Sequence, residues 1–388
     1  MPAPLEGRRI WFVGIGGAGL SGYARLARAW GAEVAGWDRV ETPYVGDLEA
    51  TIAPEPVVRD GWEVVVSTAY RDRVAGRSRA EFLAELVSLQ RSIVVSGAHG
   101  KTTTAAMIAF ALDRLGLEPS FVLGGDVPQL GGNARAGSGW LVVEGDESDR
   151  TVAALRPEIA VVVNVDLDHH SEFASRAEVQ ALFDEWLAHV PKPLVGPFEP
   201  AAIELAVPGE HNRRNAAAAL AALEAAGVEG GERVLPEFRG VGRRFELVGE
   251  ARGVTVVDDY AHNPAKVAAL LDAARERTEG RVLALFQPHL PSRTRHLWWE
   301  LGRALTRADA VCVTEIYAAR EERPPGLSGK LVADAAGEAR PGMSLGWASR
   351  LEDAAGLVAS WARPGDLVLT IGAGDVDRAA PLVLEALA

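Results

Sequence analysis

The chain has 388 residues, of which 48% are hydrophobic, and a formal net charge of −13 at pH 7. This acidic balance excludes broad, charge-driven binding to nucleic acid or to anionic membranes, so any anionic substrate has to be held by local basic groups. At roughly 150 residues per domain, the length predicts two or three domains with sizeable cores.

The sequence also excludes a disulfide framework and a membrane span. The one cysteine, Cys312, lies in the apolar run 310–313, which is typical of a core thiol, and it fits the reducing cytosol. Five glycines between residues 14 and 22 break the first apolar stretch, so we expect no signal peptide. No apolar run approaches the roughly 18 residues of a membrane helix. We therefore expect a cytoplasmic protein.

The first 90 residues begin with an expected strand, Ile10–Val13, a GxGxxG turn and a helix that ends near Trp30. A second strand, Glu33–Trp37, ends at Asp38, nineteen residues after the last glycine of the turn. In this context the turn predicts a nucleotide diphosphate at the helix N-terminus, with the acid near a ribose or base. A tight turn without a ligand is the alternative.

Polar side chains follow the next expected strand, residues 63–67, and a helix over 79–89 closes this part of the chain. Ligands of such folds bind at the carboxyl ends of the strands. The candidate ligand-binding residues of this region are Gly14, Gly16, Gly17, Gly19, Ser21, Asp38, Ser67 and Thr68.

A second glycine loop joins the apolar run 93–95 to a long apolar-periodic segment, which predicts a buried strand, a turn and a helix. Backbone N–H groups of such a loop can approach phosphate oxygens, and the helix N-terminus faces the anion. Lys101 would neutralise β/γ-phosphate charge and the Thr102 hydroxyl would bind Mg²⁺. The candidate phosphate-binding residues are Gly97, Ala98, His99, Gly100, Lys101, Thr102 and Thr103.

The strict phosphate-loop motif requires a glycine five residues before Gly100, but Val95 stands there, so a shorter GxxGKT loop remains. Only four of the 40 basic residues are lysines. A chain so rich in arginine places a lysine where a compact charge suits phosphate. A glycine-rich helix cap with a surface lysine is the alternative.

Acidic and histidine clusters follow two further expected strands. Strand 140–143 ends at Glu144, and strand 159–163 is followed by His169. A carboxylate at a strand end beside a phosphate loop suits a Mg²⁺ ligand, and we expect a metal or phosphate role for both residues. Surface or packing roles are expected for His170 and His189.

An alanine-rich helix is expected after His211, and its first-turn residues Asn212 and Asn215 either cap it or contact an adenine. From about residue 233, strands again alternate with helices, which predicts parallel sheets with polar groups at their carboxyl edges. Paired arginines follow a glycine turn in RGVGRRF and suit a γ-phosphate. The strands of this part are expected at 254–257, 281–286, 310–314 and 367–371.

Together these motifs resemble the Mur ligase family from Ile10 to about Asp375. Any one of them is suggestive, and ten in family order are highly specific. They are FVGIGGAGLSG, GAHGKTTT, EGDESD, NVDLDHH, PGEHNRRNAAAA, GVGRRFE, DDYAHNP, FQPH…SRTR, EIYAARE…SGKLVA and GAGD.

The resemblance implies a three-domain α/β fold. Residues 1–90 would form a Rossmann-like domain for the UDP of the substrate, 91–232 a shortened central P-loop ATPase domain, and 233–388 a Rossmann-like domain that closes over ATP. The implied reaction joins L-alanine to the lactyl carboxylate of UDP-N-acetylmuramate in peptidoglycan precursor synthesis. It consumes ATP, needs two Mg²⁺ ions and passes through an acyl phosphate. A monomer or weak homodimer is expected.

The resemblance also implies roles for single residues. Lys101 would bind the β/γ-phosphates, Thr102 and Glu144 one Mg²⁺, and His169 a second. Contacts with adenine would come from His211 and Asn215. From the third domain, Arg244, with Arg243, would approach the phosphates, and Asp259 and Tyr260 the nucleotide. His262 and Arg293 would face the amino acid, with the arginine on its carboxylate.

The sequence departs from the family pattern at three places. Leu290 replaces an arginine that would share the amino-acid carboxylate, and Arg295 is a possible substitute. The stretch from His169 to Pro208 is short, and Trp11 replaces a histidine. Three alternatives therefore stay open: a ligase for another amino acid or a peptide, a non-catalytic nucleotide-binding relative, and a nicotinamide dehydrogenase suggested only by the GxGxxG turn.

Overall fold

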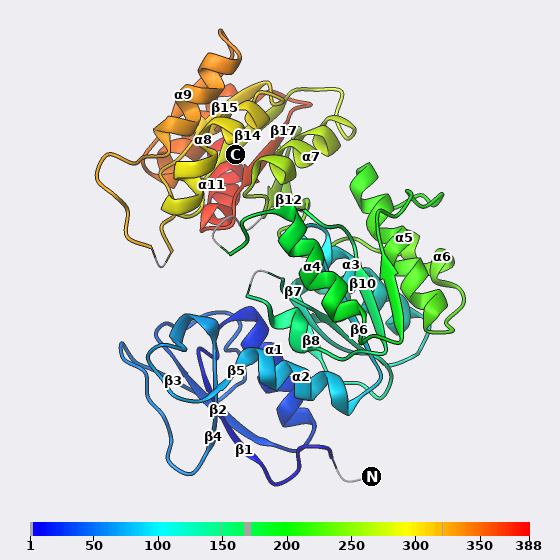
Figure 1. The fold of residues 1–388 in the computed structure, drawn as a ribbon. Coiled ribbons are helices and arrows are strands. Elements are labelled where there is room, and N and C mark those ends of the chain that lie inside the picture. Colours follow the sequence, from blue (N-terminus) through cyan, green and yellow to red (C-terminus); the bar gives the residue numbers. More distant parts are fainter. Residues whose placement is uncertain (1–2, 148, 167–171, 320) are drawn as a thin grey trace. The chain divides into compact units, whose positions relative to one another are not determined.

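The computed structural model describes residues 3–147, 149–166, 172–319 and 321–388. The chain divides into two units. The first holds residues 1–206 and 212–239, and the second holds 207–211 and 240–388. Three sheets are present, two in the first unit and one in the second (Figure 1).

The first sheet has five parallel strands in the order β3-β2-β1-β4-β5. Two helices bury apolar side chains against Ile10, Phe12 and Val65 on one face of the sheet. On the opposite face, Trp11 and Trp37 are covered by loop residues. The elements are β1 (Arg9–Val13), α1 (Ala18–Ala29), β2 (Glu33–Asp38), β3 (Ala50–Ile52), β4 (Glu63–Val66), β5 (Arg77–Ser78) and α2 (Arg79–Leu89).

The second sheet has six strands in the order β11-β10-β6-β9-β7-β8, of which only the β7/β8 pair is antiparallel. Its central strand β6 is buried along its whole length. The elements are β6 (Ser92–Ser96), α3 (Lys101–Arg114), β7 (Ser120–Val127), β8 (Gly132–Arg135), β9 (Leu141–Glu144), β10 (Ile159–Val162), α4 (Arg176–Leu187), β11 (Lys192–Val195), α5 (Glu210–Ala225) and α6 (Gly231–Val234).

The two sheets of the first unit meet through α1, which contacts β7 and β8. A Cβ atom on Gly22 of α1 would lie 2.4 Å from Cγ1 of Val122, so this position has no room for a side chain. The Asn133 side chain donates to the Ala18 carbonyl at 2.9 Å, at the first turn of α1. Contacts from β7 and β8 of the second sheet therefore hold the start of α1, which follows the glycine turn of the first sheet.

The third sheet, in the second unit, has the order β12-β13-β17-β14-β15-β16, with only β12 antiparallel to its neighbour. One face packs against α7, α8 and α9, and the other against α10 and α11. The elements are β12 (Glu246–Ala251), β13 (Val254–Asp259), α7 (Pro264–Arg275), β14 (Val282–Phe286), α8 (Pro291–Leu305), β15 (Ala310–Val313), α9 (Lys330–Ala339), β16 (Ser344–Trp347), α10 (Leu351–Trp361), β17 (Leu367–Ile371) and α11 (Ala379–Leu387).

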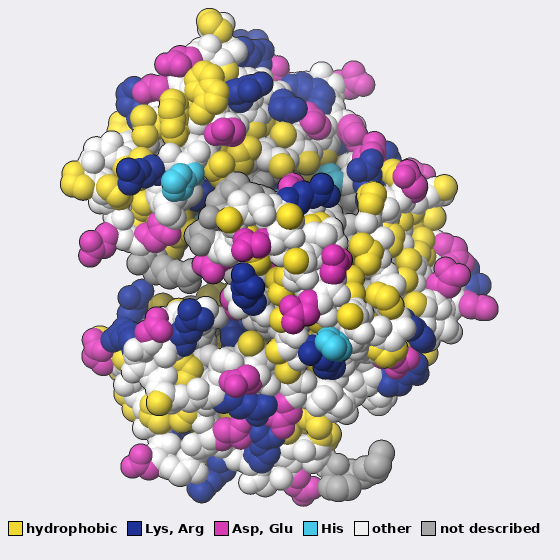
Figure 2. Space-filling model, viewed as in Figure 1, with side chains coloured by type: hydrophobic (Ala, Val, Ile, Leu, Met, Phe, Trp, Pro, Cys, Tyr) yellow, Lys and Arg dark blue, Asp and Glu magenta, His cyan; other side chains and the backbone are white. Residues whose placement is uncertain are grey.

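The expected α/β fold with largely parallel sheets is confirmed. The expected core thiol is also found, because Cys312 is fully buried in β15 and burial raises the pKa of its thiol to about 12. Among the described helices, none is long and apolar enough to cross a membrane. On the face shown in Figure 2, acidic and basic side chains are interspersed. The domain boundaries at residues 90 and 232 stay predictions.

Candidate active site

The loop between β6 and α3 has a backbone that only glycine adopts easily. Gly97 and Gly100 have φ angles of +128° and +83°. A Cβ on Gly97 would lie 2.8 Å from the Asn164 carbonyl oxygen, and one on Gly100 would lie 2.3 Å from Oδ1 of Asn215. Both positions therefore need glycine for conformation and for space. The loop passes directly into α3, whose N-cap, Gly100, makes no side-chain hydrogen bond.

Lys101, the first residue of α3, turns back over this loop. Its Nζ donates to the Gly97 carbonyl at 2.7 Å and to Oε2 of Glu147 at 2.8 Å. Burial opposes the ammonium charge, but the carboxylates of Glu147, Asp146 and Glu144 more than offset this and raise the pKa of Lys101. The lysine is therefore a fixed positive charge at the loop.

Thr102 and Glu144 form the oxygen pair that a magnesium ion would need. The Thr102 hydroxyl donates to Oε2 of Glu144 at 2.9 Å, and the Gly124 N–H donates to Oε1 at 2.5 Å. A Cβ on Gly124 would lie 3.0 to 3.2 Å from the carboxylate oxygens of Glu144 and the Thr102 hydroxyl oxygen. Because residue 124 is glycine, no side chain from this position crowds the two oxygen ligands. Hydroxyl and carboxylate oxygens suit Mg²⁺, and the two residues fit a magnesium site.

The second proposed metal ligand, His169, lies outside the described residues, as does His170. In the described part of the chain, no group of three His, Cys, Asp or Glu residues could hold a metal. His189 follows α4 near its C-terminus. The metal assignment therefore rests on Thr102 and Glu144.

Asn164, which was not among the predicted site residues, holds the phosphate loop through two hydrogen bonds to the His99 backbone. Its Oδ1 accepts from the His99 N–H at 3.0 Å, and its Nδ2 donates to the His99 carbonyl at 2.8 Å. The His99 ring lies 3.6 Å from the Asp166 carboxylate. Ala98 is buried and Thr103 is half-buried on α3. The available signal for this contact was a polar residue directly after the expected strand 159–163.

The two residues expected at adenine lie in different surroundings. Asn215 is 5% exposed and donates to the Asn212 side chain at 3.3 Å. It also lies against the phosphate loop at Gly100. His211 is exposed and belongs to the second unit. Within the first unit, Asn215 is therefore the candidate adenine residue that lies at the loop.

The GxGxxG turn of the first sheet is held by Asp38. One carboxylate oxygen accepts from the Gly16 N–H at 2.7 Å and the other from the Arg39 N–H at 2.7 Å. Gly14 has a φ of +91°, and a Cβ there would lie 2.6 Å from the Ser67 hydroxyl oxygen. Asp38 therefore shapes the turn from inside. A contact with a ribose or base remains a proposal.

The remaining candidates of this sheet lie around the start of α1. Gly17 is the N-cap and provides no side-chain hydrogen bond, and no acid occupies the first turn. Gly19 lies in that turn, and the buried Ser21 donates to the Ala18 carbonyl at 3.1 Å. Thr68 donates to Asp149 at 3.2 Å, so it links the end of β4 to the acidic segment after β9.

In the second unit, Arg243 is engaged in internal contacts. Its guanidinium donates to Asp258 at 2.9 Å and to the carbonyls of Gly374 and Gly372 at 2.9 and 2.8 Å. Arg244, the second arginine of RGVGRRF, does not make the hydrogen bonds that hold Arg243. Its guanidinium carbon lies 5.1 Å from the centre of the Tyr260 ring. These contacts favour Arg244 over Arg243 as the arginine that meets phosphate.

Asp259 also has a local role in holding the backbone. Its carboxylate accepts from the N–H groups of Phe245 and Ala261 at 2.8 and 2.7 Å. Burial raises the pKa of this carboxyl, against the opposing charge of Arg244. The turn that carries Arg244 and the start of the segment before α7 are therefore tied together.

A row of rings lies beside these residues. His262 is 5.4 Å from Tyr260 and 6.2 Å from His289, which stacks on Tyr317 at 5.8 Å, all between ring centres. The Arg293 guanidinium contacts Nδ1 of His289 at 3.2 Å. His289 was missed as a site residue, although it precedes Leu290 in a motif at a strand end.

His262 stays neutral in this cluster. Burial lowers the pKa of its imidazole well below 6.5, and the charges of Lys266, Arg293 and Arg244 lower it further. Its Nδ1 lies 2.8 Å from the Tyr260 carbonyl. The second unit therefore concentrates cations around a neutral imidazole, which suits an anionic ligand group.

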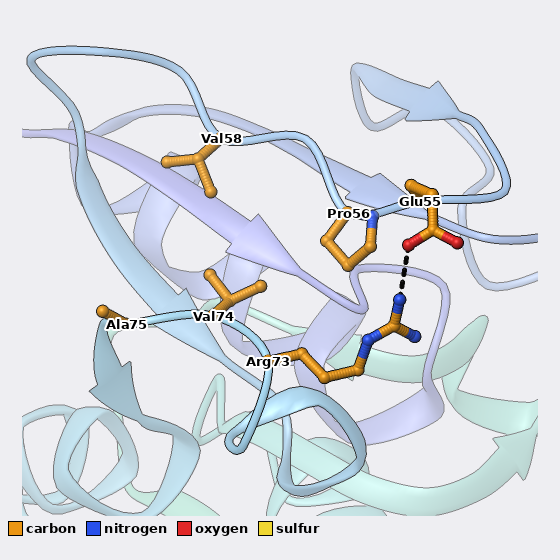
Figure 3. Close-up of a pocket in the computed structure, with 6 residues that line it drawn as sticks. All are labelled: Glu55, Pro56, Val58, Arg73, Val74 and Ala75. Carbon is orange, nitrogen blue, oxygen red and sulfur yellow. Dashed lines mark hydrogen bonds and ion pairs between the residues drawn. The ribbon is translucent and has the colours of Figure 1, made fainter.

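An open pocket of about 490 Å³ lies elsewhere, on the loop-covered face of the first sheet. An ion pair between Arg73 and Glu55, 2.5 Å apart, borders it (Figure 3). It contains none of the predicted site residues, and we place the chemistry at the strand ends instead. Its lining residues are Glu55, Pro56, Val58, Arg73, Val74 and Ala75.

Known proteins share both the sequence and the fold. The Mur ligase middle domain matches residues 95–196, and the Mur ligase glutamate ligase domain matches 243–374. UDP-N-acetylmuramate–L-alanine ligase of Streptomyces griseus is 38% identical over 463 aligned positions, covering 100% of this chain and 98% of the relative. Because this alignment is longer than the chain, the relative carries residues that the chain lacks.

Solved structures agree with this result. UDP-N-acetylmuramate-alanine ligase from Thermotoga maritima superposes with a TM-score of 0.80 at 25% identity, covering 97% of this chain and 98% of that one. A murein peptide ligase from Psychrobacter arcticus gives 0.66 at 22% identity, covering 98% and 99%, and shares the fold. From its identity to the Streptomyces relative along its whole length, the chain belongs to the Mur ligase family.

Proposed function

We propose that the chain is a cytoplasmic, ATP-dependent ligase that joins L-alanine to the lactyl carboxylate of UDP-N-acetylmuramate. One observation carries the proposal. A glycine loop presents Lys101 and Thr102 at the start of α3, with Glu144 at 2.9 Å from the Thr102 hydroxyl, in a chain 38% identical along its length to a ligase of that name.

The first step is phosphoryl transfer. A carboxylate oxygen of the lactyl group attacks the γ-phosphorus of ATP, the bond to the β-phosphate oxygen breaks, and an acyl phosphate and ADP result. Positioning and charge neutralisation supply most of the rate in such reactions. Lys101 would leave its partner Glu147 for the β/γ-phosphates. A Mg²⁺ ion held by Thr102 and Glu144 would neutralise further phosphate charge.

The second step forms the amide bond. The uncharged amine of L-alanine attacks the acyl carbon, the bond to the phosphate oxygen breaks, and the amine loses a proton as inorganic phosphate leaves. Arg293, in contact with His289, would bind the alanine carboxylate. His262 is neutral, so it adds no charge against the amine. Arg244 would approach the phosphate.

Phosphate release from ATP tests this proposal. The purified chain is given Mg²⁺, ATP and UDP-N-acetylmuramate, with a panel of single amino acids. Release that needs both UDP-N-acetylmuramate and L-alanine supports the proposal. Release that is independent of UDP-N-acetylmuramate contradicts it.

Leu290 keeps a second candidate open, a ligase that adds another amino acid or a peptide to a UDP-muramoyl acceptor. The residue is the N-cap of α8, with a φ of +68°, and carries no charge for a carboxylate. Arg293 then contacts the His289 end of the ring row without a second arginine at position 290. Release of phosphate with a different amino acid, and not with alanine, would favour this candidate.

A further inference from the structure

Arg79 is a half-buried cation that neither the sequence patterns nor the proposed reaction uses. It is the first residue of α2, directly after β5, and 28% of its side chain is exposed. Its guanidinium interacts with the Tyr23 hydroxyl of α1, and α1 and α2 are neighbours (Figure 1). The acidic residues whose charges act on it, Asp149 and Asp146, come from the segment after β9.

The carboxylate of Asp149 lies near Arg79 but does not satisfy its donors. The Arg79 Nε atom lies 3.8 Å from Oδ2 of Asp149, too far for a hydrogen bond. That carboxylate instead accepts from the Thr68 hydroxyl at 3.2 Å and from the Thr151 N–H at 3.0 Å. Nε of Arg79 is buried and has no hydrogen-bond acceptor among the described residues. Such an orphaned, charged donor is rare in a folded protein.

The Arg79 guanidinium nevertheless stays protonated. Burial opposes it, but Tyr23 and the carboxylates of Asp149 and Asp146 more than offset burial and raise the pKa of the guanidinium. A residue that served only to tie α2 to the acidic segment would gain most by direct, paired hydrogen bonds to a carboxylate. Arg79 keeps its charge without making them.

The cation lies beside the glycine turn of the first sheet. A Cβ on Gly19, in the first turn of α1, would lie 4.0 Å from the hydroxyl oxygen of Tyr23, which interacts with Arg79. Thr68, which shares Asp149 with Arg79, follows Ser67, whose hydroxyl faces Gly14. The first turn of α1 has neither a capping side chain nor an acid. Arg79 thus adds a full positive charge next to an uncapped helix start.

We propose that Arg79 binds an anionic group of UDP-N-acetylmuramate, either its diphosphate or its lactyl carboxylate, through the part of its side chain that remains exposed. This inference rests on the proposed function, because it takes the UDP-sugar as the ligand of the first sheet. It assigns substrate binding to a residue outside the GxGxxG turn. Arg79 would place the substrate between that turn and the acidic segment that also carries Glu147.

Calorimetric titration with three ligands tests the proposal. UDP supplies the diphosphate, UDP-N-acetylglucosamine adds the sugar without the lactyl group, and UDP-N-acetylmuramate adds the carboxylate. Arg79→Met removes the charge, and Arg79→Lys keeps the charge but loses the paired N–H donors of the guanidinium. Arg77→Met is the matched control, since Arg77 lies two residues away and is paired with Glu85 at 2.5 Å and Glu63 at 3.2 Å.

We expect Arg79→Met to weaken UDP-N-acetylmuramate binding by about tenfold or more, the scale of one charged hydrogen bond, and Arg79→Lys to weaken it less. Equal weakening for all three ligands assigns Arg79 to the diphosphate, and weakening of UDP-N-acetylmuramate alone assigns it to the lactyl carboxylate. Arg77→Met should bind all three as the wild type does. Thermal unfolding checks that each variant is folded.

Wild-type binding that both folded Arg79 variants retain unchanged would overturn the inference and leave the proposed function standing. The same holds if only Arg79→Lys folds and it binds like the wild type. A wild-type chain that binds none of the three ligands would instead overturn the proposed function, and the inference with it. Equal weakening by Arg77→Met would also overturn the inference, since the effect would then not be specific to Arg79.

Discussion

The Nζ atom of Lys101 lies 2.8 Å from Oε2 of Glu147, a carboxylate whose side chain is only 2% exposed. The phosphate-loop lysine is thus paired with a carboxylate inside the protein. A buried ammonium and a buried carboxylate stabilise each other only as a pair, because either one alone is costly to desolvate. If Lys101 binds the phosphates of ATP as proposed, the nucleotide has to replace Glu147 as its partner.

Glu147→Ala should therefore destabilise the chain. It leaves the Lys101 ammonium without its closest carboxylate, at a cost of about 2 to 3 kcal/mol. Urea unfolding measures this loss. Asp334→Ala is the control, because it removes the partner of Lys330 from an exposed pair, which should change stability by less than about 0.5 kcal/mol. If both substitutions lowered the free energy of unfolding equally, the buried Lys101–Glu147 pair would contribute no more to stability than the exposed Lys330–Asp334 pair.

Lys101→Ala should abolish turnover and leave binding of UDP-N-acetylmuramate largely intact. The reason is that the Lys101 ammonium donates to the phosphate loop and to Glu147, and not to the glycine turn of the first sheet. Phosphate release and calorimetry measure the two properties. Lys192→Ala, at an exposed lysine of edge strand β11, should retain activity. Loss of both properties in Lys101→Ala would indicate misfolding.

Gly100→Ala should damage the phosphate loop in two ways. The φ of +83° disfavours alanine, and the new Cβ would lie 2.3 Å from Oδ1 of Asn215. We expect ATP binding at least tenfold weaker, together with a lower urea midpoint. Gly116→Ala is the matched control, since its φ is +74° and nothing lies within 4 Å of the Cβ position. It should cost about 1 kcal/mol and leave ATP binding unchanged; similar ATP affinities in both variants would contradict the clash.

The main strands were predictable because they are continuous apolar runs buried on both faces, as in β6 and β14. Helix α2 was placed at Arg79–Leu89, where Ser78 and Glu81 form a capping box. The edge strand β11 was missed. Its four residues are largely exposed and include Pro193, so they carry no apolar pattern.

Partners within the site were less predictable than its location. The run EGDESD indicated an acidic strand end, and the family resemblance placed Glu144 with Thr102 at one ion, but the sequence did not indicate that Glu147 meets Lys101. The paired arginines in RGVGRRF look equivalent in sequence. In the structure Arg243 has a φ of +57° and donates to Asp258, and neither feature can be seen in the sequence. Roles of all these residues in catalysis stay predictions.

The depressed pKa of His262 predicts a pH dependence of stability. Above pH 6.5 the imidazole is neutral in both the folded and the unfolded chain. Between pH 6.5 and the lower folded-state pKa, the unfolded chain binds a proton that the folded chain does not, so stability falls as pH falls. Urea unfolding at pH 7.5 and pH 5.5 should show a smaller loss for His262→Gln than for the wild type. An identical loss in both would mean that His262 titrates normally.

Arg293→Ala should raise the KM for the amino acid far more than the KM for ATP. Arg293 contacts His289 at 3.2 Å in the ring row, and one charged hydrogen bond to a carboxylate corresponds to at least about a tenfold change. Steady-state kinetics with each substrate varied in turn measure the split. Arg303→Ala, near the C-terminal end of the same helix α8, is the control and should leave both constants unchanged. If Arg293→Ala raises both constants equally, the arginine does not select the amino acid.

Leu290→Arg extends this prediction to the residue that precedes α8. An arginine there would offer a second guanidinium at the N-terminus of the helix that carries Arg293. If the alanine carboxylate binds at this end of α8, the KM for alanine should fall and the KM for ATP should not change. Leu290 already has a φ of +68°, so the substitution adds no new backbone strain. An unchanged KM for alanine would mean that another cation already completes the carboxylate site, and Lys266, whose charge reaches His262, would be the next residue to replace.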